Sequence, residues 1–144
     1  MKQLLLGLAL TVVVAVWVAC GSSSGGIGLQ PGINGCTSFT DATAQSASRT
    51  INFGGSRGNV YDPKCLAIAA TQQVTLTGSF ADHPLRPGLA PSQAGGPDAG
   101  SPNNPIQSTT SGSSTLFTFA TAGTYPYYCS LHEGQGMFGA VQVR

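Results

Sequence analysis

The chain has 144 residues, enough for one domain, and only 8% of them are charged. Without Lys2, five basic residues balance five acidic ones, and no basic patch is interleaved with aromatic residues, so we expect no nucleic-acid partner. Glycine, proline, serine and threonine are abundant and no long helical periodicity follows residue 20, which predicts an all-β sandwich or barrel of short strands.

Residues 1–20 have the pattern of a signal peptide. Met1-Lys2 is a minimal positive start, and the apolar run over residues 4–19 is short for a membrane span. Because Val18-Ala19-Cys20-Gly21 resembles a bacterial lipobox, we expect Cys20 to be lipidated and the protein to be exported to the periplasm or cell envelope. Cleavage after Gly21 and an uncleaved transmembrane helix are the alternatives.

Residues 21–33 follow as a predicted tether. They begin with a run of serine and glycine, and a flexible linker of this kind lets a domain stand off from a membrane anchor. Residues 34–144 are then expected to form the single folded domain.

Six segments of this domain are predicted strands because apolar residues alternate with polar ones or because β-branched and aromatic residues are enriched. They cover residues 49–53, 66–69, 73–80, 115–119, 123–128 and 138–143. The third runs into His83, which is therefore expected at the end of a strand. Pro126 lacks an N–H donor and predicts an edge position for its strand. Residues 84–113 are long for a loop and are expected to contain one short strand near 105–107.

One loop near the C-terminus gathers three metal-binding side chains. Cys129, His132 and Met137 supply a thiolate, an imidazole and a thioether within nine residues. Cysteine with two histidines and a weak axial methionine is the ligand set of electron-transferring copper sites. The second histidine would have to be His83, the only other one in the chain. The alternative interpretation is a buried cysteine, a surface histidine and a core methionine that are neighbours by chance.

The segment 123–143 resembles the C-terminal hairpin of the plastocyanin branch of the cupredoxins, which also includes auracyanin and pseudoazurin. The shared residues are Gly123, Tyr125, Tyr128, Cys129, Ser130, His132, Gly134, Gly136, Met137, Gly139, Val141 and Val143. The resemblance implies a Greek-key β-sandwich, transfer of single electrons, and one copper ion per chain held by His83, Cys129, His132 and Met137.

The chain departs from the family at two positions beside the ligands. Leu131 stands where a proline usually precedes the C-terminal histidine ligand, and Pro84 stands where an asparagine often follows the first one. Since that asparagine helps to tie the ligand loop by hydrogen bonds, its absence puts the rigidity of the site in question.

The resemblance also implies an electron-transfer surface. The C-terminal histidine ligand sits in an apolar surface patch in the family, and the residue before the cysteine offers a second route. These positions correspond to His132 and Tyr128, with Leu85, Leu131 and Phe138 as candidates for the patch. Tyr128 is equally well interpreted as a core aromatic residue.

Cysteine usage agrees with an exported protein. Cys20 is lipidated or removed and Cys129 is used by the metal, so Cys36 and Cys65 remain as a pair in an oxidising compartment. A disulfide between them would close a loop of about 30 residues, for which chain entropy estimates a stabilisation of roughly 3–4 kcal/mol. Two free thiols are the alternative.

We therefore expect a monomeric type 1 blue copper protein that carries electrons between redox partner proteins. No nucleophile–base arrangement is present to build an enzyme, and two histidines are too few for a multicopper oxidase. Zinc is the competing metal, although structural zinc sites seldom use methionine. A copper-delivery protein and a metal-free cupredoxin-like recognition domain remain as alternative functions.

Overall fold

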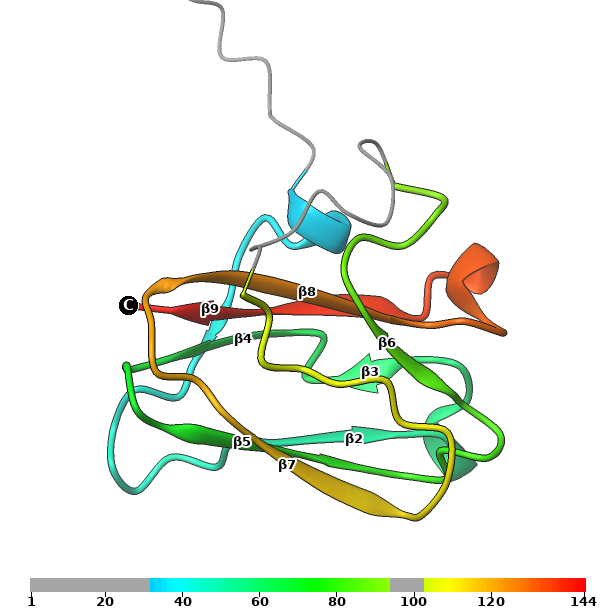
Figure 1. The fold of residues 1–144 in the computed structure, drawn as a ribbon, viewed down its shortest axis with the longest axis horizontal. Helices are drawn as coiled ribbons and strands as arrows, with labels where there is room; N and C mark the ends of the chain where they lie inside the picture. Colours follow the sequence, from blue (N-terminus) through cyan, green and yellow to red (C-terminus); the bar gives the residue numbers. More distant parts are fainter. Residues whose placement is uncertain (1–31, 94–102) are drawn as a thin grey trace, which may run out of the picture.

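The computed structural model describes residues 32–93 and 103–144, which form a sandwich of two β-sheets (Figure 1). The strands are β1 (Thr40–Asp41), β2 (Thr50–Phe53), β3 (Tyr61–Asp62), β4 (Cys65–Ile68), β5 (Gln73–Thr77), β6 (Leu85–Pro87), β7 (Ser114–Thr118), β8 (Gly123–Cys129) and β9 (Phe138–Val143). Three 3₁₀ turns accompany them, η1 (Ile33–Gly35), η2 (Gly55–Arg57) and η3 (Glu133–Gln135).

The predicted signal peptide, Cys20 and all but the last two residues of the predicted tether lie outside the described residues. Within residues 32–93 and 103–144, no helix has both the length and the apolar composition needed to cross a membrane.

The two sheets have the orders β1-β4-β9-β8-β6 and β3-β2-β5-β7. β8 and β9 pair antiparallel, whereas β4 pairs with β9 and β2 with β5 in parallel. The chain changes sheet at each connection from β4 through β8, and this alternation builds the expected Greek-key β-sandwich. The η2 and η3 turns lie at the same end of the sandwich, away from the C-terminus (Figure 1).

The core lies between the sheets and follows the predicted alternation. In β5, Val74 and Leu76 are fully buried while the residues between and beside them are at least partly exposed. The same holds in β2, where Ile51 and Phe53 face inward. Burial of these apolar side chains is the main favourable contribution to folding.

The strand predicted over residues 73–80 ends earlier than expected, at Thr77. Gly78 passes so close to the backbone and ring of Phe53 that a side chain would not fit there. The chain then turns, and His83 lies in the β5–β6 loop two residues before β6 instead of at the end of β5. The strand expected near 105–107 is also absent; a single bridge joins Thr109 to Leu85 instead.

Pro126 does not mark an edge strand, because β8 lies between β9 and β6. The β6–β8 pairing ends at Pro87 and Tyr127, so Pro126 lies just beyond it. Its carbonyl still accepts the Gly88 N–H at 2.9 Å. Pro126 has no N–H to donate to the Gly88 carbonyl. The Nδ2 amide of Asn34 donates to this carbonyl instead, at 3.3 Å.

The expected disulfide between Cys36 and Cys65 is present, across a sequence separation of 29 residues. It joins the segment after η1 to the start of β4. The N-terminal end of the described domain is therefore covalently attached to an internal strand of the first sheet.

Candidate metal centre

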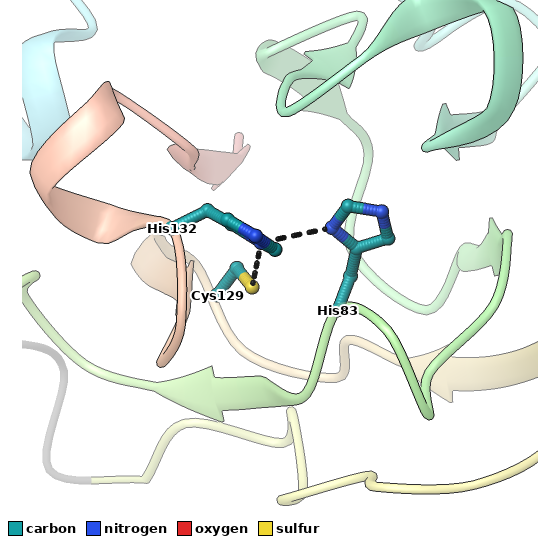
Figure 2. A group of neighbouring side chains, drawn as sticks. All are labelled: His83, Cys129 and His132. Carbon is teal, nitrogen blue, oxygen red and sulfur yellow. Dashed lines mark hydrogen bonds between the residues drawn. The ribbon is translucent and has the colours of Figure 1, made fainter.

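His83, Cys129 and His132 converge at the end of the sandwich where the β5–β6 and β8–β9 connections meet (Figure 2). The two Nδ1 atoms of the histidines are 3.1 Å apart, and the Cys129 sulfur is 3.4 Å from Nδ1 of His132. All three ligand atoms lie within 4.8 Å of one another. The structure thus brings together residues separated by 49 positions in the chain.

The hairpin between β8 and β9 shapes one half of this site. Cys129 donates its amide to the Met137 carbonyl at 2.9 Å, and Met137 donates to the His132 carbonyl at 3.2 Å. Gly136 adopts a left-handed conformation with φ of 91°, which allows the η3 turn to close. Met137 is fully buried in the same cluster as Cys129. Its role as a fourth ligand stays a prediction.

The loop that carries His83 is tied to this hairpin by backbone contacts. The Ser130 amide donates to the Pro84 carbonyl at 3.0 Å, and Leu85 lies opposite Cys129 in the β6–β8 pairing. The proline that replaces the family's asparagine therefore still holds the two loops together, through its carbonyl oxygen.

Two further hydrogen bonds connect the η3 turn to other loops. The Asn59 amide donates to Oε1 of Gln135 at 2.6 Å, and the Ser92 amide donates to the Glu133 carboxylate at 3.2 Å. The partners are 76 and 41 residues apart, so no local pattern in the sequence indicates them.

The surroundings of His83 set the position of its ring. The residue is 8% exposed, and the Phe53 ring meets it edge-to-face at a centroid distance of 5.9 Å. Gly54 borders its other edge: a Cβ there would lie 2.9 Å from Nε2 of His83. Sequence analysis missed this glycine, although a glycine pair directly after a strand was a visible signal.

Protonation of the site follows from its burial. Burial lowers the pKa of His83, the charge of His132 lowers it further, and Asp82 opposes both. Burial raises the pKa of the Cys129 thiol, and the backbone amides of Leu131 and His132 partly offset that effect. At neutral pH His83 is therefore a neutral donor, whereas a metal has to displace the thiol proton from Cys129.

The donor set fits a soft or borderline transition metal. Metal–nitrogen distances are about 2.0–2.1 Å, so one ion can reach two nitrogens that lie 3.1 Å apart. Thiolate and imidazole ligands favour copper or zinc over magnesium or calcium, which prefer oxygen. Because Cys129 is fully buried and His83 nearly so, a bound ion would be shielded from water.

The predicted surface residues divide into two groups. His132 and Tyr128 are half-buried, and Leu131 is 64% exposed. The prediction that Leu85 and Phe138 belong to a surface patch is wrong. Leu85 faces the core and is fully buried, and the Phe138 ring is covered by the Lys64 ammonium group at 4.2 Å.

Comparison with known proteins finds similarity to copper-binding proteins. Residues 49–144 match the family described as copper binding proteins, plastocyanin/azurin family. The chain is 29% identical over 113 residues to plastocyanin of Prochlorothrix hollandica, covering 77% of this chain and 84% of that protein. It is 31% identical over 110 residues to the chloroplastic plastocyanin of Physcomitrium patens, covering 69% of this chain and 60% of that protein.

Among solved structures, oxidised plastocyanin from Dryopteris crassirhizoma is similar with a TM-score of 0.44 and 24% identity. That match covers 66% of this chain and 99% of the plastocyanin.

Proposed function

Since the chain belongs to the plastocyanin/azurin family of copper-binding proteins, we propose that it is a type 1 blue copper protein that carries single electrons. The observation that carries this proposal is the convergence of His83, Cys129 and His132 on one point within 4.8 Å. Met137 is the proposed fourth, weak ligand. A copper ion held there would supply the Cu(II)/Cu(I) couple.

The protein's own contribution is to hold the ligands in one arrangement. The Ser130–Pro84 bond and the closed hairpin hold the two ligand loops against each other, so a change of oxidation state would require little movement. Half-exposed His132 is the proposed site of electron entry and exit, with Tyr128 as a second route. Acid would weaken copper binding, because protons compete for the sulfur and the imidazoles.

We further propose where this carrier works. We expect residues 1–20 to be a signal peptide, Cys20 to be lipidated and residues 21–33 to be a tether. The domain of residues 34–144 would then lie in the periplasm or cell envelope, anchored to a membrane. As a monomer there, it would exchange electrons with redox proteins whose identity the chain does not specify.

A titration of the purified chain with Cu(II), followed by visible absorption, tests the function. The expected result is an intense blue band that saturates at one copper per chain and is bleached by a mild reductant. His83→Ala should abolish this band because a ligand is lost. The matched control is Asp82→Asn, which changes the exposed neighbouring residue and should leave the band intact.

Other outcomes separate the alternative functions. Tight binding of Cu(I) without a blue Cu(II) form would contradict electron transfer and support copper delivery. No uptake of copper in either oxidation state would support a metal-free recognition domain. A blue band that survives in the His83→Ala variant would remove His83 from the ligand set.

A further inference from the structure

The η3 turn, which directly follows His132, is not held in place by packing. None of its residues is buried, and a Cβ placed on Gly134 or Gly136 would meet no described atom within 4 Å. These two glycines alternate with Glu133 and Gln135, and they give an open turn large conformational freedom. The backbone hydrogen bonds of the turn join residues of the hairpin only to one another, so they do not fix the turn relative to the rest of the sandwich.

The two residues of the turn that are not glycine supply this attachment through their side chains. Oε1 of Gln135 accepts the side-chain amide of Asn59 at 2.6 Å, and the carboxylate of Glu133 accepts the backbone N–H of Ser92 at 3.2 Å. Asn59 lies between η2 and β3 of the second sheet, whereas Ser92 lies in the segment after β6 of the first sheet. The turn is therefore connected to segments of both sheets.

These attachments act on the backbone of a proposed ligand. The N–H groups of Gln135 and Met137 both donate to the His132 carbonyl, at 3.0 and 3.2 Å. A shift of the turn would therefore move His132. Its Nδ1 atom now lies 3.1 Å from Nδ1 of His83 and 3.4 Å from the Cys129 sulfur, so even a small shift would change the spacing of the three donor atoms.

We propose that Asn59 and Glu133 are positioning residues, whose bonds to Gln135 and Ser92 clamp the η3 turn and hold His132 at the metal centre. The inference rests on the proposed function. Outer residues that orient a ligand affect a metal site although they do not touch the ion. A histidine ligand that keeps its position in both oxidation states leaves the protein little to rearrange when an electron is transferred.

Amide hydrogen exchange in the full chain, without added copper, tests the clamp directly. Asn59→Ala and Gln135→Ala remove the same bond, so each should speed exchange at the amides of residues 135 and 137. The increase should be roughly two- to tenfold, the range that corresponds to one net hydrogen bond. The double variant should show no larger effect than either single variant, because residues that share one interaction are not additive.

Gln73→Ala is the matched control for this assay. Gln73 is also exposed and also makes a bond between side chains, to Oγ1 of Thr118 at 3.0 Å. It lies at the start of β5, whereas His83 follows the end of that strand. The control should leave exchange at residues 135 and 137 unchanged; an increase equal to that of Asn59→Ala would overturn the proposal.

Substitutions of Glu133 test the second bond in the same assay. Glu133→Gln keeps an oxygen that can accept the Ser92 N–H, whereas Glu133→Ala removes it. Exchange at residues 135 and 137 should therefore be faster in the alanine variant than in the glutamine variant. Equal exchange in the two variants would contradict a role for this bond.

Electron self-exchange of the copper-loaded chain tests the consequence for the metal centre. Asn59→Ala and Gln135→Ala should both slow it, and the double variant should again resemble the single ones. Effects that add up would show that the two side chains act separately, through the surface on which the molecules meet, and would overturn the proposal. An unchanged rate in Asn59→Ala would overturn it as well.

The two assays separate this inference from the proposed function. If the parent chain forms no blue site but the variants show the expected amide exchange, the proposed function fails and the clamp on the η3 turn stands. If the blue site forms but Asn59→Ala leaves amide exchange unchanged, the clamp fails and the proposed function stands.

Discussion

Asn34 holds three separate parts of the first sheet together, so its replacement should strongly destabilise the protein. The side chain is fully buried, and its Nδ2 amide donates to the carbonyls of Tyr127 at 2.8 Å, Gly139 at 3.0 Å and Gly88 at 3.3 Å. Its Oδ1 accepts the Ala90 amide at 3.0 Å. It therefore connects η1 with both strands of the ligand hairpin and with the loop after β6.

The Asn34→Gly variant isolates the side-chain contacts, because Asn34 has φ of 48° and glycine tolerates that conformation. The variant would leave the Ala90 amide buried without a partner, which costs about 1–3 kcal/mol. The two shorter bonds to carbonyls contribute about 1 kcal/mol each. We expect a loss of roughly 3–5 kcal/mol, a large part of the 5–15 kcal/mol typical of a domain.

Urea unfolding of the metal-free protein measures this loss through the transition midpoint and slope. Asn34→Asp is the matched control: it keeps the shape but places a carboxylate oxygen against carbonyl oxygens, so it should be at least as destabilising as glycine. A loss below about 1 kcal/mol for Asn34→Gly, with an unchanged slope, would refute the reasoning, because water would then satisfy the exposed groups.

Two further substitutions test the surroundings of the site and the N-terminal attachment. Gly54→Ala should weaken copper binding and shift the blue band, because the new Cβ would lie 2.9 Å from Nε2 of His83. The control is Gly58→Ala, since Gly58 has nearly the same backbone conformation (φ 67° and ψ −148°, against 70° and −168° for Gly54) but open space around it. A similar effect of both substitutions on the visible spectrum would contradict this explanation. Replacing Cys36 and Cys65 together by serine should lower the free energy of unfolding by roughly 3–4 kcal/mol in thermal or urea unfolding; an unchanged stability would show that other contacts hold η1 in place.

The sequence alone predicted the features of this protein that depend on neighbouring residues in the chain. The alternation in residues 73–77 specifies which side chains face the core, because side chains in a strand alternate between two faces. The spacing of Cys129 and His132 is short enough for one hairpin to bring both to the same point. These features need no knowledge of distant partners.

Tertiary structure decided the features that depend on distant partners. Pro126 suggested an edge strand, yet β8 is internal, because Asn34, 54 residues before Gly88, supplies the donor that is missing opposite the Gly88 carbonyl. The glycine pair that begins at Gly54 is visible in the sequence, but its importance depends on the imidazole of His83, which only the fold places beside it.

The metal centre itself combines both kinds of information. Residue types and the family resemblance predicted His83 as the partner of Cys129 and His132, but the predicted strand end was the wrong place for it. The packing of the two sheets brings its loop to the hairpin, and backbone hydrogen bonds hold the loop there. Composition and spacing thus determined which atoms could bind a metal, whereas only the folded chain, through long-range packing, determined that they meet.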